Sequence, residues 1–404
     1  MKKIASILLA LSTAFSVNAD YKEISLTDDI HLKYQGAFRF SVDDVGASRM
    51  PFTNGVFTIA PNGIDFFASG HAQMQGIAEF SMPSLEKTQS VKKLPFAKIK
   101  QPFVQYVKNP KKLKNSQNLD TISGMELIEG ELFVNAVEYY DAPADNTHTT
   151  FIIRKPSNLK KSKVNGFFKL QGRVNAAGWM SKIPDSVKSE FPGSYIVGNA
   201  SNVPINTRLS IGPSAFASNI DALAGLEKKG GVIPTFEMMN FSVNSPLHPD
   251  QYNKSKKNDV WTEVSYAAYG FIEPNGKYYI IVGHSGGHNS SIGYKIKQNN
   301  GKKCGGPCSR DYKDNYNYYW IFDVKDLLKA KNGELLSTKI RPIKYGELDM
   351  PFQPKNGILR KVIGADFDPK YNNLWFLLEN VDHTQSKYEA APVMAVYKLS
   401  IEKA

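Results

Sequence analysis

Apolar residues along the chain fall into short runs of strand length and almost nowhere recur at helical spacing. Two segments show the pattern most clearly: VFTIAPNGIDFFASGH (56–71) and YGFIEPNGKYYIIVGH (269–284). In each, two apolar runs flank a Pro-Asn-Gly turn, and the second run ends in Gly-His. Runs rich in β-branched and aromatic residues on either side of such a turn predict β-hairpins.

Three weaker copies of this plan follow at 124–141, 191–201 and 363–383. After each copy comes a further strand-like run, at 76–83, 148–156, 207–213, 318–324 and 393–400. Repetition at intervals of about 50 to 90 residues favours an all-β protein, a β-propeller with about four strands per blade. We predict five blades.

Other β architectures use similar strands. Six or seven blades would require degenerate blades at 84–120 and 220–260. A β-sandwich does not explain so many copies of one unit, and a β-helix needs shorter and more regular periods. The best helical segment is VKDLLKAKNGE (324–334), which we expect to end at Gly333.

The later half of the chain resembles a group of uncharacterised secreted bacterial proteins that look like β-propellers. The segments that carry the resemblance are GWMSKIP (178–184), LSIGPSAF (209–216), YWIFDVKDLLKAKNG (319–333) and VIGADFDPKYNNLWF (362–376). The resemblance implies a propeller fold and export, and it supplies no catalytic residue.

The first residues, MKKIASILLALSTAFSVNA (1–19), have the layout of a secretory signal peptide. The apolar run is shorter than the roughly 20 residues that a spanning helix needs, so we expect no membrane span after signal removal. We therefore predict a periplasmic or secreted protein whose remaining residues, 20–404, form one propeller domain with a long loop at about 285–316.

The chain carries a formal net charge of +12, and much of it lies in lysine runs at 108–116, 155–163 and 253–259. A basic exported protein suits an anionic glycan or another cell-surface polymer, and we expect no nucleic acid as partner. Lysine runs are also typical of solvated loops, so charge alone does not identify the ligand.

Cys304 and Cys308 are the only cysteines, in the motif CGGPC. Three residues separate them, rather than the two of a thioredoxin-type pair, and no βαβ pattern surrounds them. In an oxidising compartment this spacing predicts a local disulfide bond.

Propeller symmetry predicts a ring of polar groups, because the ends of equivalent strands gather around one central funnel. Aligned on the hairpin turn, five positions follow the second strand of the five copies: His71, Glu138, Asn199, His284 and the pair Asp382-His383. Ligand sites favour concave places where polar groups converge, so we expect His71, Glu138, Asn199 and His383 to bind substrate.

Gly286 and Gly287 would let the chain fold back and bring His284 and His288 to one ligand. With Glu138 as a third group, or with Asp382 or His383 in its place, such a set could hold a divalent metal ion. The alternative is a flexible loop in which His288 faces water.

The loop after His288 combines Lys295, Lys297, Lys302, Lys303 and Arg310 with the tyrosines of DYKDNYNYYW (311–320). Aromatic faces for sugar rings and cations for carboxylates or sulfates would suit an acidic polysaccharide. The competing interpretation is that Tyr316, Tyr318 and Trp320 pack between blades.

Cleavage of a uronate chain by β-elimination needs a base, a cationic clamp and an acid. We expect His284 or His288 to be the base, Tyr294 or Tyr139 the acid, and Arg208 the clamp. Some polysaccharide lyases are propellers with histidine and tyrosine at the funnel, and the similarity to them lies at the level of the fold alone.

Two other functions remain open. One is a glycoside hydrolase that uses paired carboxylates from Glu138, Asp141, Glu263, Glu379 and Asp382. The other is a non-catalytic module that attaches to a protein or a surface. The chain has no G-x-S-x-G elbow, Walker loop or dinucleotide fingerprint.

Overall fold

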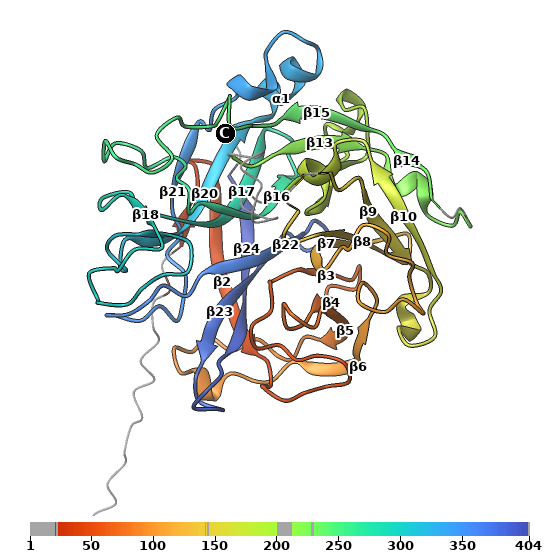
Figure 1. Ribbon diagram of the computed structural model, residues 1–404, viewed down its shortest axis with the longest axis horizontal. Coiled ribbons are helices and arrows are strands. Elements are labelled where there is room, and N and C mark those ends of the chain that lie inside the picture. Colours follow the sequence, from red (N-terminus) through yellow and green to blue (C-terminus); the bar gives the residue numbers. More distant parts are fainter. Residues whose placement is uncertain are drawn as a thin grey trace, which may run out of the picture.

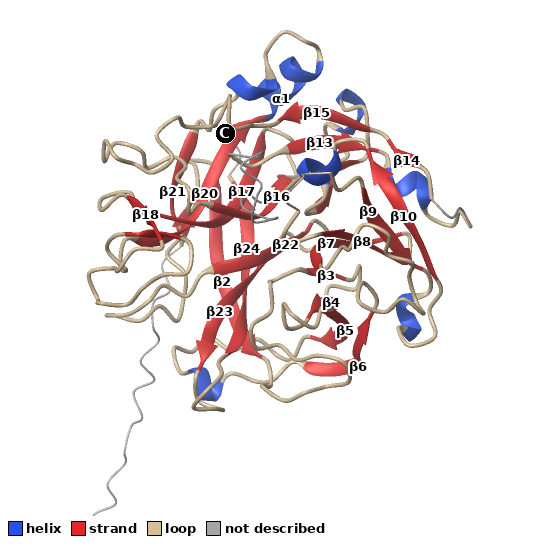
Figure 2. Ribbon diagram, in the orientation of Figure 1, coloured by secondary structure: helices blue, strands red, loops and turns tan. Residues whose placement is uncertain are grey.

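A computed structural model describes residues 21, 23–141, 143, 145–199, 212–227 and 230–402 (Figure 1). Within these residues, the long strands form five mainly antiparallel blades around a central axis, so the predicted five-bladed β-propeller is confirmed. Figure 2 shows that the regular structure is mostly strand, joined by many loops, with a few short helices.

The first three blades are built in chain order. Blade 1 contains β3 (Phe57–Ile59), β4 (Asp65–Ser69), β5 (Gly76–Ser81) and β6 (Lys98–Gln105). Blade 2 contains β7 (Thr121–Ile128), β8 (Glu131–Val137), β9 (His148–Ile153) and β10 (Val164–Leu170), with β14 (Val232–Ile233) parallel to β10. Blade 3 contains β11 (Met180–Lys182), β12 (Tyr195–Val197), β13 (Ala215–Ser218) and β15 (Thr235–Met239).

Blade 4 contains β16 (Tyr266–Ile272), β17 (Tyr278–Gly286), β20 (Asn315–Asp323) and β21 (Lys344–Glu347). Between β17 and β20, the strands β18 (Ile292–Tyr294) and β19 (Pro307–Ser309) form a small separate sheet. Blade 5 contains β22 (Val362–Asp368), β23 (Asn373–Asp382), β24 (Ala391–Ile401), β2 (Ile30–Arg39) and β1 (Ile24–Ser25).

The described residues also form one α-helix, α1 (Val324–Lys331), and several short 3₁₀ helices. The Asp323 side chain caps the start of α1 by accepting a hydrogen bond from the Lys325 N–H, and Gly333 follows the helix at φ 78°. The predicted helical segment is therefore confirmed. The 3₁₀ helices are Val91–Lys93, Pro156–Asn158, Arg173–Ala176, Lys188–Glu190, Ile220–Leu223 and Ser337–Lys339.

Strand pairing between the two ends of the chain closes the ring. β2, near the start, pairs with β24, near the end, along almost its whole length. The inner strands β3, β7, β11, β16 and β22 contact one another in a circle around the axis. Closure pairs the strand edges that an open array of blades would expose.

The inner strands approach so closely that they require glycine at one level of the axis. A Cβ on Gly364 of β22 would lie 1.8 Å from the Gly55 carbonyl oxygen, and a Cβ on Gly124 of β7 would lie 1.8 Å from the Gly178 carbonyl oxygen. Only a residue without a side chain fits such contacts. Near this level the axis holds a void of about 30 Å³, which has room for one or two water molecules.

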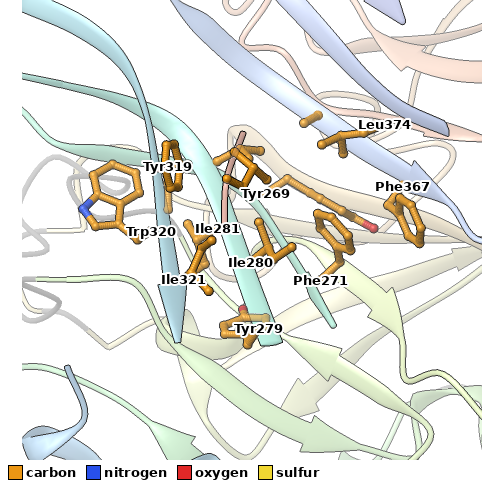
Figure 3. Close-up of a cluster of buried hydrophobic side chains, with 14 of the residues drawn as sticks. Tyr269, Phe271, Tyr279, Ile280, Ile281, Tyr319, Trp320, Ile321, Phe367 and Leu374 are labelled. Atoms are coloured by element: carbon orange, nitrogen blue, oxygen red, sulfur yellow. The ribbon is translucent and has the colours of Figure 1, made fainter. Parts of the chain in front are cut away.

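Apolar side chains fill the space between the blades. Figure 3 shows part of the largest cluster, where residues of β16, β17 and β20 meet residues of β22 and β23. Phe271 of β16 stacks on Phe367 of β22 with ring centroids 4.4 Å apart. Tyr318 and Trp320 are buried in the same cluster, as their alternation predicted.

The five hairpin copies map onto the five blades. Both Pro-Asn-Gly turns have their glycine in the left-handed region, Gly63 at φ 70° and Gly276 at φ 76°. In blade 3, however, the third strand is β13 (Ala215–Ser218) rather than the predicted 207–213, of which 207–211 lie outside the described residues. The segments 84–120 and 220–260 supply outer strands, not additional blades.

No helix in the described part of the chain is long and apolar enough to cross a membrane. The predicted signal peptide, residues 1–19, lies outside the described residues.

Candidate functional site

A cavity of about 470 Å³ opens on the face where the inner strands begin. This volume is within the range of small-ligand sites. Its walls come from the starts of inner strands and from the residues that follow second strands. The lining residues are Asn54, Val56, Ala72, Gln73, Gln75, Lys108, Asp120, Thr121, Ile122, Ser123, Tyr139, Asn199 and Tyr266.

Side-chain amides in the wall are held in place by the backbone. The Asn54 Nδ2 donates to the Ile122 carbonyl, while the Gln75 Oε1 accepts from the Ile122 N–H at 2.7 Å. The buried Asn199 donates from Nδ2 to the Val174 carbonyl at 2.6 Å. These bonds fix the orientation of groups that can both donate and accept hydrogen bonds.

Asp120 and Tyr139 form a second fixed unit of the wall. The Asp120 Oδ1 accepts from the Thr121 hydroxyl at 2.9 Å and from the Tyr139 N–H at 2.8 Å. The Tyr139 ring is 46% exposed, so its face is available to a ligand. A carboxylate and an aromatic face therefore lie together on this side of the cavity.

The other side carries a group of titratable residues from blades 4 and 5, which we call the funnel cluster: Tyr266, His284, Lys361 and Glu379. Tyr266 lies opposite His284 in the pairing of β16 with β17, and the two rings stack with centroids 5.1 Å apart. The Glu379 N–H donates to the Lys361 carbonyl at 2.9 Å. Only Tyr266 of these four lines the cavity directly.

Burial sets the protonation of the funnel cluster. It lowers the pKa of His284 to about 3, with the Lys361 charge acting in the same direction. The neutral His284 ring donates from Nδ1 to the Val362 carbonyl at 3.1 Å, which leaves Nε2 as an acceptor. Burial raises the pKa of Glu379, although the Lys361 charge opposes this shift, and it raises the pKa of Tyr266 to about 12.

The structure places the predicted ring at different distances from the cavity. Of the ring, Asn199 lines the cavity, and His284 stacks on the lining residue Tyr266. Tyr139, predicted as an acid rather than as part of the ring, also lines the cavity. His71 and Glu138 each precede a lining residue, Ala72 and Tyr139. The His71 ring accepts from the Gln73 N–H and lies edge-on to Phe52, so it supports the rim.

His288 does not line the cavity. Its Nε2 is 2.8 Å from the buried Ser285 hydroxyl, and its ring packs against Tyr316 and Tyr318. Tyr294, proposed as an acid, does not line the cavity either; it is exposed on β18 beneath Lys295.

His383 is exposed and donates to the Asn380 carbonyl, while Asp382 is buried against Arg39, Thr384 and Gln385. Arg208, the predicted clamp, lies outside the described residues.

The proposed metal site is not found. Among the described residues, no group of three or more histidine, cysteine, aspartate or glutamate side chains could hold a metal ion, and these residues include His284, His288 and Glu138. The physical reason is that His284 and His288 point into different surroundings: His284 stacks on Tyr266 near the axis, whereas His288 packs on the tyrosines of β20.

Several of the predicted carboxylates have structural partners. Asp141 is buried and accepts from the N–H groups of Asp145 and Asn146, and Asp382 pairs with Arg39 at 3.1 Å. Glu263 is buried as well. Glu379 differs from these because its raised pKa leaves it protonated over more of the pH range.

Aligning the five hairpin copies on their turns did not predict Asp120, Tyr266 and Gln75. Each of these residues lies just before or at the start of a strand, whereas the alignment selected residues that follow the second strand of each hairpin. The alignment also missed a pair of acids on the axis. Glu126 of β7 accepts from the Thr58 hydroxyl at 3.2 Å, and Asp366 of β22 accepts from the Ile59 N–H at 2.6 Å. Burial raises the pKa of both acids, and the charge of Asp366 adds to the shift of Glu126.

No protein-family model and no curated protein matches the chain. Its fold is similar to that of solved structures at low sequence identity. A GH130 structure, from work on glycoside hydrolases that target β-1,2 mannosidic linkages in Candida mannan, matches with TM-score 0.43, 12% identity, and coverage of 95% of this chain and 99% of that one. A glycosyl hydrolase from Bacteroides ovatus matches with TM-score 0.44, 12% identity, and coverage of 90% and 89%.

An α-L-arabinofuranosidase from Podospora anserina, solved with cellotriose, matches with TM-score 0.35, 9% identity, and coverage of 92% and 98%. At such identities and scores, these similarities assign no activity to this chain.

Proposed function

We propose that the funnel binds a saccharide unit of an extracellular glycan. The observation that supports this most is the lining of the cavity, where fixed amides, hydroxyls, one carboxylate and an exposed tyrosine face converge. Sugar hydroxyls donate and accept hydrogen bonds, and the apolar face of a sugar ring packs on aromatic rings. The wall offers both kinds of contact within one small volume.

Hydrolysis of the bound glycan is a second candidate function, and the raised pKa of Glu379 favours it. Burial raises the pKa of Glu379, so this carboxyl holds its proton to a higher pH than an ordinary glutamate, and a protonated carboxyl can protonate the oxygen of a leaving sugar. Asp120, from blade 2, would be the second carboxylate that such a reaction needs.

Cleavage by β-elimination, with His284 as the base, is less favoured by this geometry. A catalytic base works best when its pKa is near the working pH, and a pKa of about 3 makes His284 a weak one. The Nε2 of His288 is already hydrogen-bonded to Ser285. In our proposal, His284 therefore accepts a hydrogen bond in the funnel rather than removing a proton.

Binding is tested first, with a glycan array and then with calorimetry on the glycans it retains. We expect Tyr139→Ala to weaken binding about tenfold, because it removes the stacking face and leaves the backbone bond to Asp120 in place. Tyr140→Ala is the matched control, since Tyr140 is adjacent and exposed but does not line the cavity. Equal binding by wild type and Tyr139→Ala would contradict the funnel as the site.

Cleavage is tested by chromatography of the same glycans after incubation with wild type and with Glu379→Gln. Hydrolysis predicts products with wild type and intact glycan with Glu379→Gln, while both proteins bind. Products that absorb in the ultraviolet from uronate polymers would instead restore β-elimination. Binding without any product would leave a non-catalytic attachment module.

A further inference from the structure

Two lysine-rich segments that are far apart in the sequence are joined in the structure. Residues 250–260 precede blade 4, and residues 291–313 contain β18, β19 and the disulfide. The Ile292 N–H donates to the Tyr252 carbonyl at 2.9 Å, so the first segment lies directly against β18. We call their exposed cations the hairpin surface: Lys254, Lys256, Lys257, Lys295, Lys297, Lys302, Lys303, Arg310 and Lys313.

Buried asparagines hold the first segment in place. Asn253 is fully buried, and its Nδ2 donates to the carbonyls of Gly287 and His288 at 2.8 and 2.7 Å. Its Oδ1 accepts from the N–H of Asn258, whose own amide donates to the carbonyls of Asp250 and Trp261. The lysines between these two residues therefore stand on a fixed backbone, unlike those of a solvated linker.

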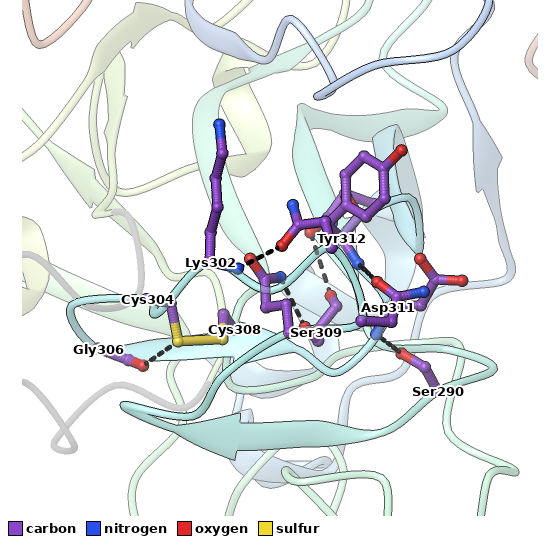
Figure 4. Close-up of a disulfide and its surroundings, with 12 residues drawn as sticks. Ser290, Lys302, Cys304, Gly306, Cys308, Ser309, Asp311 and Tyr312 are labelled. Atoms are coloured by element: carbon purple, nitrogen blue, oxygen red, sulfur yellow. Dashed lines mark hydrogen bonds between the residues drawn. A yellow bond between two sulfur atoms is a disulfide. The ribbon is translucent and has the colours of Figure 1, made fainter.

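The second segment is also fixed. β18 pairs with β19, and Lys297 forms a β-bridge with Lys303. The disulfide between Cys304 and Cys308, confirmed by the structure, closes the tip of this hairpin, and Lys302 extends away from it (Figure 4). Figure 1 shows β18 at the periphery of the molecule, away from the axis.

The cations of this surface outnumber the acids beside them, although the charge of Asp311 acts on Lys313. None of its nine cations forms a salt bridge within the described residues. The nearby acids serve the backbone instead: Asp250 accepts from the N–H groups of Lys254 and Ser255, and the buried Asp314 accepts from those of Asn289 and Ser290. An anion at this surface would thus meet lysine and arginine side chains that are not paired with a carboxylate in a salt bridge.

Two tyrosines accompany the cations. The Lys295 ammonium lies 5.2 Å from the centre of the Tyr294 ring, and the Lys313 ammonium lies 5.8 Å from that of Tyr312. Tyr294 is 54% exposed and thus offers a flat face beside a positive charge. A sugar ring that carries a sulfate or carboxylate could pack its apolar face on such a tyrosine and place its negative charge beside the lysine.

We propose that the hairpin surface is a second site, separate from the funnel, that binds a sulfated or carboxylated polysaccharide. A membrane surface fits less well, because the large exposed apolar residue within this surface is a tyrosine rather than the aliphatic residues that insert into lipid. The disulfide favours an oxidising compartment outside the cytosol, so we propose an acidic polysaccharide rather than a nucleic acid as the polyanion.

The test uses heparin as the probe and two triple variants of equal charge. Lys295→Gln/Lys297→Gln/Lys302→Gln removes cations from the hairpin surface, and Lys160→Gln/Lys161→Gln/Lys163→Gln removes exposed cations from the β9–β10 loop. We expect heparin to bind the first variant about tenfold more weakly, since three cations that would pair with its anionic groups are lost, and to bind the second like wild type. Affinity should also fall as salt rises.

Equal losses in the two variants would overturn the proposal, because binding would then depend on net charge alone. Tighter binding of a single-stranded oligonucleotide or of anionic phospholipid vesicles than of heparin and polygalacturonate would also overturn it. Tyr139→Ala should leave heparin binding unchanged. This control separates the hairpin surface from the funnel, so that either site can fail without the other.

Discussion

At the scale of single residues, the surroundings of each group matter more than its chemical type. His284 and His288 are four residues apart, yet one is neutral beside Tyr266 near the axis and the other is hydrogen-bonded to Ser285. Glu379 and Asp382 are three residues apart. One has a raised pKa, and the other has its pKa lowered by hydrogen bonds from Thr384, Gln385 and Arg39 against the effect of burial.

The lowered pKa of His284 predicts that the free energy of unfolding decreases measurably as the pH falls. Its pKa of about 3 in the fold is below the ordinary value of 6.5, so the unfolded chain takes up the proton first as pH falls. Between pH 7 and pH 5 this group alone should cost the wild type roughly 2 kcal/mol. His284→Asn keeps a donor for the Val362 carbonyl and should reduce the pH dependence by that amount in urea unfolding. Identical pH profiles would show that His284 titrates normally.

At the scale of elements, the inner strands bring together side chains from different blades. Glu126 and Asp366 belong to blades 2 and 5, and both reach the axis beside β3 of blade 1. Because their pKa values are raised, the folded state holds more protons than the unfolded state above about pH 4. The stability contributed by these groups therefore declines as pH rises toward neutral.

Glu126→Gln should consequently stabilise the protein at pH 8, by about 1 kcal/mol, because an amide has no ionised form for burial to disfavour and can keep the bond from Thr58. The gain should disappear near pH 4. Glu129→Gln, at the exposed turn of the same hairpin, is the control and should change little. Urea unfolding at both pH values measures the difference; a loss of stability at pH 8 would contradict the repulsion between the two acids.

The close approach of the inner strands predicts a large effect from one methyl group. Gly364→Ala would place a Cβ against the Gly55 carbonyl oxygen and should destabilise the protein by about 2 kcal/mol or more. Gly305→Ala is the control, since its added Cβ would meet nothing within 4 Å. Equal thermal unfolding midpoints for the two variants would contradict the prediction, because they would mean that the inner strands can move apart to accommodate the added methyl group at little cost in stability.

The disulfide acts on its own hairpin. It links residues four apart, so it constrains the unfolded chain little and should contribute about 2 kcal/mol or less. Cys304→Ser/Cys308→Ser should therefore unfold at nearly the same temperature as wild type. Trypsin should cleave the variant faster after Lys302 and Lys303, as mass spectrometry would show. Unchanged cleavage would mean that the β18–β19 pairing alone orders the segment.

At the scale of the whole molecule, the ring is held closed by pairing between distant parts of the chain. Removal of residues 21–39 would delete β1 and β2 and leave the long strand β24 with an unpaired edge. We expect this variant to lose its cooperative unfolding transition and to associate through that edge. Size-exclusion chromatography and calorimetry would detect both changes. A monomer with the wild-type transition would show that the three strands β22, β23 and β24 suffice for blade 5.

The sequence by itself determined the local features of this protein. The alternation of apolar runs and Pro-Asn-Gly turns predicted the hairpins and their number, and the short spacing of Cys304 and Cys308 predicted their bond, because strands, turns and short loops depend on neighbouring residues. The tertiary structure decided which groups meet. Tyr266 and Glu379 are more than a hundred residues apart, as are Glu126 and Asp366, and closure of the ring brings each pair together. The same closure, by removing water from these groups, sets the pKa of His284 and Glu379, which no spacing of residues could reveal.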